Sequence, residues 1–183
     1  MSEGSELNDL IAYAADKLFD VYSQYPAATS IHHAFCGGLL NHTYQMLHML
    51  EGLYPCLPYP VRLDHCTLAI LFHDYGKVMT YTRSGDNQPI AYQLGHVYIS
   101  ANALQQELER RNIAQEEVNA IVHIVLAHHG QLEFGSPVMP CSMEAVIVHM
   151  LDNISAKTDT IENCGNMEYS SALLTHVVKQ AVK

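Results

Sequence analysis

The stretch CTLAILFHDYGK, residues 66–77, decides how the rest of the chain is interpreted. Its first seven residues are apolar apart from one threonine. A helix that is apolar on all sides is buried on all sides, so this run predicts a core helix over about 62–75. His73 and Asp74 stand at its C-terminal end, and Gly76 predicts the stop because glycine takes the left-handed conformation that closes helices. A buried carboxylate is costly unless it is paired or bound to a metal, so this helix end predicts a polar site in the core.

The composition is typical of one folded domain with a full core. The chain has 183 residues, of which 49% are hydrophobic and 15% charged, so residues 1–183 are expected to form a single domain. No apolar run reaches the ~18 residues of a membrane span, so no membrane partner is expected. The first ten residues lack the basic start and apolar middle of a secretory signal. The five cysteines show no CxxC spacing and indicate reduced thiols, so a cytoplasmic location is expected.

The charge balance argues against a long nucleic acid as ligand. The chain has 9 Lys and Arg against 19 Asp and Glu, and a formal net charge of −10. A surface that holds a long phosphate backbone neutralises several phosphates with basic side chains. Long RNA or DNA is therefore expected to bind only if a partner chain supplies that surface, and the sequence leaves the oligomeric state open.

Amphipathic periodicity predicts helices along most of the chain. The predicted helices cover residues 6–24, 38–52, 62–75, 95–111, 115–129, 142–160 and 167–181. Residues 78–93 alternate in polarity around a Gly-Asp-Asn turn, which predicts a short β-hairpin or an extended excursion. The predicted class is all-α, with at most one small β element.

Polar residues interrupt this apolar pattern at a few positions inside or at the ends of helices. They are His42, His73, Asp74, His96, His128, His129 and Asp152. Asp152 is the clearest case, because a lone aspartate buried on its apolar helix face would cost several kcal/mol. Any one histidine could be an ordinary core or surface residue, but the set favours a metal site, since imidazoles and carboxylates are the usual ligands of Mn, Fe, Co, Ni and Zn. Such a set exceeds the needs of one ion and suits two, with one carboxylate as a bridge.

Four blocks of this sequence carry a resemblance to a known family. The order His42, then His73-Asp74, then Asp152 resembles the H…HD…D signature of the HD-domain superfamily of metal-dependent phosphohydrolases, and the other three histidines match those of its binuclear members. The blocks HHAFCGGLLNHT, LFHDYGK, LGH and HHGQLEFGSPVMP are similar, in this order, to the HD domain of YhaM-type 3′-to-5′ exoribonucleases. The resemblance covers about residues 30–160. It implies a bundle of about five to seven helices whose ligands meet in one pocket.

The resemblance also implies a role for each residue of the set. One ion would be held by His42, His73, Asp74 and Asp152. The other would be held by Asp74 as the bridge, His96 and His128, with His129 either as a further ligand or as support for one. A hydroxide between two divalent transition ions would attack the phosphorus atom of a phosphoester.

Three further residues are candidates for work beside the metals. Lys77, one turn past the HD pair, could bind a phosphate oxygen, although a solvated helix-end lysine is the plain alternative. His33 precedes a glycine pair that allows close backbone approach, and it could donate to phosphate or to the leaving group. Asp74, Lys77 and His33 are thus the predicted catalytic residues. His149 lies three residues before Asp152 and could support a ligand.

Departures from the family pattern limit the substrate prediction. YhaM-type enzymes carry an OB-fold before the HD domain, for which 183 residues are expected to leave no room. No Gly-Tyr-Pro follows the histidine pair, as it does in cyclic-dinucleotide enzymes of the superfamily. The predicted substrate is therefore a nucleotide, a short oligonucleotide or another small phosphoester. Two alternatives remain: a di-iron oxygenase, because myo-inositol oxygenase-like HD proteins use the same ligand order and a lysine after the HD pair, and a non-catalytic HD module for binding or assembly.

Overall fold

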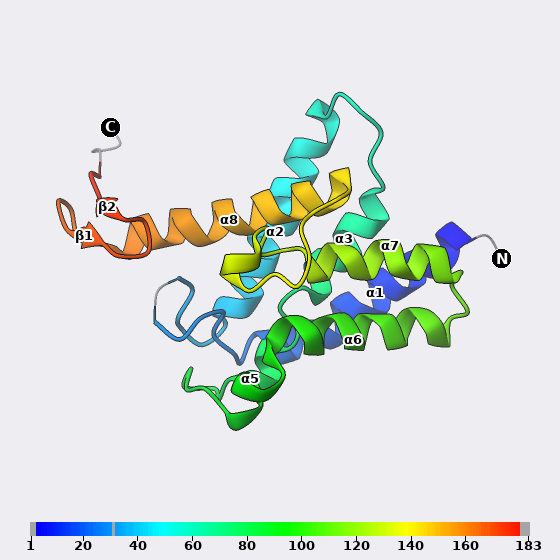
Figure 1. The fold of residues 1–183 in the computed structure, drawn as a ribbon, viewed down its shortest axis with the longest axis horizontal. Coiled ribbons are helices and arrows are strands. Elements are labelled where there is room, and N and C mark those ends of the chain that lie inside the picture. The colour runs from blue at the N-terminus through cyan, green and yellow to red at the C-terminus, as the bar shows by residue number, and fades with distance from the viewer. Residues whose placement is uncertain (1–2, 31, 180–183) are drawn as a thin grey trace.

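Helices make up most of the chain in a computed structural model that describes residues 3–30 and 32–179 (Figure 1). The helices are α1 (Glu3–Tyr22), α2 (Gly38–Leu53), α3 (Leu63–Phe72), α4 (Lys77–Thr80), α5 (Pro89–Gln93), α6 (Gly95–Arg110), α7 (Gln115–Leu126) and α8 (Met143–Asn163), with short 3₁₀ turns at Tyr54–Cys56 (η1) and Leu132–Phe134 (η2). The all-α prediction is confirmed. None of the helices in these described residues is long and apolar enough to cross a membrane.

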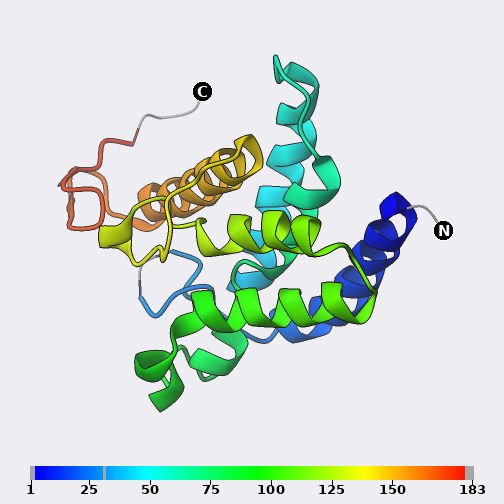
Figure 2. The ribbon, with the colours of Figure 1, turned by 45° about the vertical axis from the view of Figure 1, so that its right-hand side comes forward.

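The apolar helix α3 lies at the centre of the fold, as its sequence predicts. Apolar side chains from Cys66 to Phe72 are buried, and α1, α2, α6, α7 and α8 all pack against this helix. In Figure 2, α6 and α7 run side by side, and α8 and α1 lie on opposite sides of the picture. The buried position of α3 brings whatever follows Phe72 into the interior.

The chain leaves α3 earlier than predicted, and Gly76 has a different role. The helix ends at Phe72, and His73 to Gly76 form turns that lead into α4. Gly76 has φ −58°, a right-handed conformation open to any residue, so the predicted left-handed stop was wrong. A Cβ at this position would instead overlap the carbonyl oxygen of His96 and lie 2.7 Å from the Cα of His96. Glycine is needed here because the start of α6 presses against the turn.

Residues 78–93 reverse direction but form no two-stranded ladder. Within these described residues the strand pairing is a single β-bridge between Tyr81 and Asn87, flanked by α4 and α5. The turn is closed inside itself, since the backbone N–H of Thr82 donates to the carbonyl of Asp86 at 2.9 Å. Pro89 then stands at the first turn of α5, where its missing N–H costs no hydrogen bond. The hairpin predicted near 78–93 is thus reduced to one bridge between two short helices.

The predicted helix over 167–181 was wrong within the described residues; 180 and 181 lie outside them. The chain forms a small antiparallel hairpin there, with β1 (Tyr169–Ser170) paired to β2 (Thr175–His176), beyond the end of α8 (Figure 1). Met167 and Leu174 have φ values of 62° and 56°, which no helix permits. The buried Val177 exchanges backbone hydrogen bonds with Met167 and Glu168 at 2.7 and 2.8 Å, which closes the hairpin onto the end of α8.

Candidate metal centre

All the ligand residues predicted from the sequence meet at one place in the structure. They come from five parts of the chain: His42 from α2, His73 and Asp74 from the turn after α3, His96 from the first turn of α6, His128 and His129 from the end of α7, and Asp152 from α8. Helices α3, α6 and α7 each have one end at this place, whereas His42 and Asp152 lie within α2 and α8.

The first group of side chains consists of His42, His73 and Asp152. The Nε2 atoms of His42 and His73 lie 3.2 Å apart. Oδ1 of Asp152 lies 3.1 Å from Nε2 of His42. The three ligand atoms are close enough to one another to bind a single metal ion.

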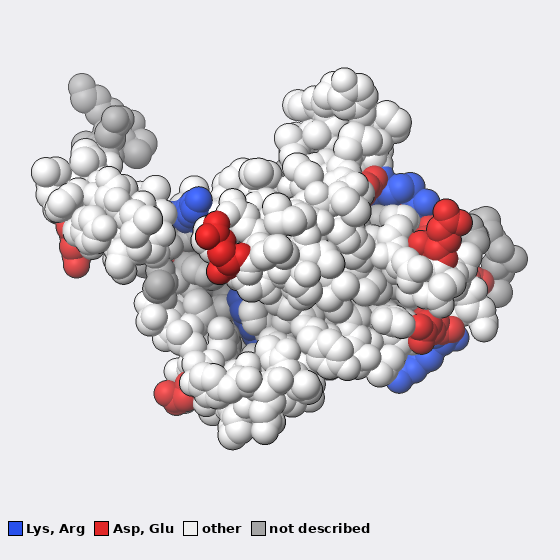
Figure 3. Space-filling model, in the orientation of Figure 1, with Lys and Arg blue, Asp and Glu red and all other residues white. Residues whose placement is uncertain are grey.

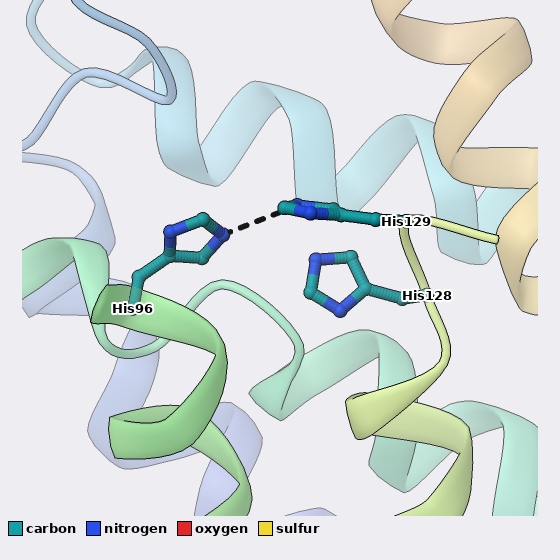
Figure 4. A group of neighbouring side chains, drawn as sticks. All are labelled: His96, His128 and His129. Atoms are coloured by element: carbon teal, nitrogen blue, oxygen red, sulfur yellow. Dashed lines mark hydrogen bonds between the residues drawn. The ribbon is translucent and has the colours of Figure 1, made fainter. Parts of the chain in front are cut away.

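The second group consists of His96, His128 and His129 (Figure 4). The Nε2 atoms of His96 and His129 lie 3.3 Å apart, and the ring centroids of His128 and His129 are separated by 4.3 Å. Figure 4 shows His96 reaching toward the two adjacent rings from the opposite side. This group could hold a second ion.

Asp74 lies between the two groups and turns one carboxylate oxygen toward each. Oδ2 is 3.2 Å from Nε2 of His73 and 3.8 Å from Nε2 of His42. Oδ1 is 3.5 Å from Nε2 of His96 and 3.9 Å from Nε2 of His128. Among the described residues, neither Oδ1 of Asp74 nor Nε2 of His128 has a hydrogen-bond partner, although both are buried. Buried polar atoms without partners are rare, and here both point to a common space that suits a cation.

The protons of the imidazoles face away from this space. Nδ1 of His73 lies 2.8 Å from the carbonyl oxygen of Ile70. Nδ1 of His128 lies 2.6 Å from that of Val125, and Nδ1 of His129 lies 2.8 Å from that of Phe134. A carbonyl oxygen can only accept, so each Nδ1 carries a proton, and in the neutral form of each ring Nε2 keeps a lone pair. Metal-binding histidines commonly donate their other N–H in this way. The arrangement therefore fits divalent ions bound to the Nε2 atoms.

Burial keeps the second group of imidazoles neutral. It lowers the pKa of His96 to about 3, with Lys77 acting in the same direction. The pKa of His128 falls well below its usual value through burial and through the nearby His129, and burial also lowers the pKa of His129. Burial would raise the pKa of the Asp74 carboxyl, but Lys77 and His73 outweigh it and hold that pKa well below the usual range. Neutral imidazoles and an ionised carboxylate are the forms that bind metal.

Lys77 belongs to this site and is not a solvated helix-end residue. Its side chain is buried, and Nζ lies 2.6 Å from Oδ2 of Asp74. Burial alone would lower the pKa of the ammonium group, but the Asp74 carboxylate outweighs it and the pKa is raised. A charged amine therefore lies within reach of any group bound beside Asp74.

His33 lies beside the first group, with its ring centroid 5.3 Å from that of His42. Its Nε2 atom is 3.2 Å from Oε1 of Gln45, and its backbone N–H donates to Oδ2 of Asp159 at 2.7 Å. The backbone of His33 fits here because position 38 is glycine, since a Cβ there would overlap the carbonyl oxygen of His33.

His149 was expected to support a ligand, and its Nδ1 donates to the carbonyl of His128 at 2.7 Å.

Sequence reasoning missed two polar residues that contact the site. Oγ of Ser155 lies 2.8 Å from Nδ1 of His42 and also donates to Oε1 of Gln45 at 2.8 Å. Gln45 follows His42 by three residues, and Ser155 follows Asp152 by three. Residues three apart share one face of a helix, so this spacing from each predicted ligand was the signal that could have found them.

A cavity of about 490 Å³ adjoins the centre. His129 and Asp152 line it on the metal side, together with Phe134, His149 and Lys157. Residues 172–174 of the loop between β1 and β2 form another part of its wall. The hairpin of β1 and β2, which the sequence did not predict, thus borders the cavity beside the centre.

The family model for the HD domain matches residues 39–157, more than half of the chain. The chain belongs to the HD-domain family. HD-domain proteins are generally metal-dependent phosphohydrolases that bind divalent ions, and all the ligand candidates of this HD domain lie inside the matched range. His33 lies outside it. A comparison with solved structures gave no significant match. The predicted closeness to YhaM-type enzymes stays a prediction.

Proposed function

We propose that this HD-domain protein is a binuclear metal-dependent phosphohydrolase that cleaves a small phosphoester, such as a nucleotide or a short oligonucleotide. One observation carries the proposal: the buried carboxylate of Asp74 lies between two groups of imidazole nitrogens and turns one oxygen toward each. A bridging carboxylate is the feature that distinguishes a two-metal site from two separate sites.

The proposed ligands divide between the two groups. His42, His73, Asp74 and Asp152 would hold one divalent transition ion (Mn, Fe, Co, Ni or Zn). Asp74, His96, His128 and His129 would hold the other. When bound, such a pair lowers the pKa of water and neutralises the charge of phosphoryl oxygens.

The protein's own residues prepare this chemistry in three ways. The buried helix end keeps bulk water from three of the proposed ligands, since His73, Asp74 and His128 are at most 2% exposed. The backbone carbonyls of Ile70, Val125 and Phe134 hold three Nε2 lone pairs in the direction of the common space. Lys77 supplies a fixed positive charge, and its ammonium group would bind a phosphate oxygen once Asp74 is engaged in bridging.

The size and charge of the surroundings support a small substrate. The adjoining cavity of about 490 Å³ lies within the range of small-molecule sites, roughly 300–1,000 Å³. Phe134, 61% exposed at its wall, offers an aromatic face, and Lys157 offers a charge for a second phosphate. Elsewhere the basic side chains are few and scattered, as Figure 3 shows for one face of the molecule. These features suit one or two phosphates rather than a long strand.

The experiment is a substrate panel with protein loaded with Mn²⁺ or Co²⁺. Nucleoside phosphates, dinucleotides and simple phosphate mono- and diesters are supplied, and the products are separated by chromatography. We expect hydrolysis of at least one class, its loss with EDTA and its return when metal is added back. His42→Ala should abolish turnover. The matched control is His48→Ala, which removes an exposed histidine from the same helix and should leave the rate unchanged.

Two results would contradict the proposal. Dioxygen uptake coupled to substrate loss, with no ester cleaved, would indicate a di-iron oxygenase. Full metal occupancy with no turnover of any phosphoester would indicate a binding module.

A further inference from the structure

A series of buried and partly buried hydrogen bonds leads from the proposed ligand His42 to residues outside the ligand set. Nδ1 of His42 lies 2.8 Å from Oγ of Ser155. Ser155 in turn lies 2.8 Å from Oε1 of Gln45, and the same oxygen is 3.2 Å from Nε2 of His33. These residues come from α2, from α8 and from the loop before α2. The hydrogen bonds therefore join three segments next to the group of His42, His73 and Asp152.

The direction of each proton follows from the acceptor at the end of the chain. The amide oxygen Oε1 of Gln45 can only accept. Ser155 has one hydroxyl proton, and it goes to Gln45. The serine oxygen must then accept from His42, so the proton of His42 is on Nδ1. In the neutral ring, Nε2 of His42 then keeps a lone pair, and this atom faces Asp152 and His73.

We infer that Gln45 and Ser155 are positioning residues that hold His42 in its metal-binding tautomer. His33 donates from Nε2 to the same amide oxygen and keeps the amide of Gln45 from turning over. If the amide turned over, its NH₂ group would face Ser155, the serine proton would go to Nδ1 of His42, and the lone pair would point away from the metal. The inference rests on the proposed metal centre and assigns a structural cause to the form of one ligand.

The loop that carries His33 is itself held in place at two points. Oδ2 of Asp159 accepts the backbone N–H of His33 at 2.7 Å, and Oδ1 of Asp159 lies 3.7 Å from Nε2 of His33. Gly38 allows the carbonyl of His33 to lie against its backbone, where any side chain would overlap it. The positioning of His42 therefore depends on contacts made by α8 and by the loop, in addition to its own helix.

The test compares two changes at one position. Gln45→Met keeps the length of the side chain but removes its acceptor, whereas Gln45→Glu keeps an acceptor for both donors. Ser155→Ala removes the hydroxyl itself. The matched control is Thr160→Ala, which removes a buried hydroxyl from the same helix, one that donates to the carbonyl of Ala156 in its own helix. Thermal unfolding is measured for every variant, so that a loss of folding is not mistaken for a loss of positioning.

Two measurements give the answer without any assay of catalysis. The ¹⁵N shifts of labelled histidines in the metal-free protein report the tautomer of His42, with the His42→Gln spectrum as the assignment. Equilibrium dialysis against Zn²⁺ reports the affinity of each site. Gln45→Met and Ser155→Ala should both lose the single Nδ1–H form and weaken one of the two ions by about 10–100-fold. Gln45→Glu and Thr160→Ala should match the wild type in both measurements.

The inference is overturned if Gln45→Met and Ser155→Ala keep the wild-type tautomer and bind both ions with wild-type affinity. It is equally overturned if Gln45→Glu fails as Gln45→Met does, because the acceptor would then not be the property that matters. A wild-type protein that binds metal but hydrolyses nothing would contradict the proposed function while leaving these results valid.

Discussion

The backbone of Gly76 lies directly against the backbone of His96. A Cβ at position 76 would overlap the carbonyl oxygen of His96 and lie 2.7 Å from its Cα, so only glycine fits. The backbone N–H of Gly76 also donates to Oγ of Ser100 at 2.8 Å. Gly76 follows Asp74 by two residues, so this contact joins the turn that carries the Asp74 carboxylate to the helix that carries His96, a proposed ligand of the second ion.

Gly76→Ala should separate these two elements. The added methyl group has to push α6 away, which should cost about 1–3 kcal/mol in the free energy of unfolding and weaken the second ion more than the first. Gly52→Ala is the control, because no atom lies within 4 Å of a Cβ there, and it should raise stability by up to ~1 kcal/mol. Urea unfolding and metal titration measure the two effects. Equal free energies of unfolding and equal metal affinities in the two variants would show that the contact between Gly76 and His96 contributes to neither.

The metal-free protein should lose stability as the pH falls below about 6.5, the ordinary pKa of histidine. Burial lowers the pKa of His96 to about 3 and also lowers those of His128 and His129. Below pH 6.5 the unfolded chain therefore takes up protons that the folded chain refuses. Each such histidine lowers the free energy of unfolding by up to about 1.4 kcal/mol per pH unit, for His96 until about pH 3.

His73 acts in the opposite direction and offsets part of this loss. Burial would lower its pKa, but Asp74 outweighs burial and raises it, so its contribution is present at low pH and is lost as the pH rises through its folded pKa. Urea unfolding of EDTA-treated protein at pH 7.5 and 5.5 measures the sum. We expect lower stability at pH 5.5 and a smaller difference for His96→Gln. Equal stability at the two pH values would disprove the assignment.

A single-stranded RNA of about twenty nucleotides should bind the protein weakly at ~0.15 M salt. Salt screens the attraction between phosphates and basic side chains, and this protein offers few basic side chains. The reason is the excess of 19 acidic over 9 basic residues. Fluorescence anisotropy with labelled RNA measures the affinity, and gel electrophoresis detects shortening of the strand. Sub-micromolar binding by the protein alone, or processive shortening, would contradict the small-substrate proposal and favour an exoribonuclease.

The sequence predicts the centre of this fold well because the signals there are local. The apolar run before His73 requires burial wherever it lies, so α3 could be predicted without knowing its neighbours. Aspartate and histidine within apolar helices are costly in any fold, so residues such as Asp152 stood out individually. Their convergence in space then followed from the family resemblance.

Features that depend on distant neighbours could not be predicted in this way. The need for glycine at position 76 comes from His96, which is twenty residues away in the chain. The spacing of Gln45 and Ser155 from predicted ligands indicates a shared helix face, but the hydrogen bond between them depends on how α2 and α8 pack together. The hairpin after α8 places Met167 and Leu174 at positive φ values, which their residue types do not predict.

The central claim, that Asp74 bridges two metal ions, is tested most directly by the metal content of anaerobically purified protein and its variants. Equilibrium dialysis followed by elemental analysis should find about two transition ions per chain in the wild type and about one in His96→Ala. Asp74→Ala should hold neither ion at wild-type affinity, because both groups lose the shared carboxylate. If Asp74→Ala retains two ions at wild-type affinity, the account is wrong.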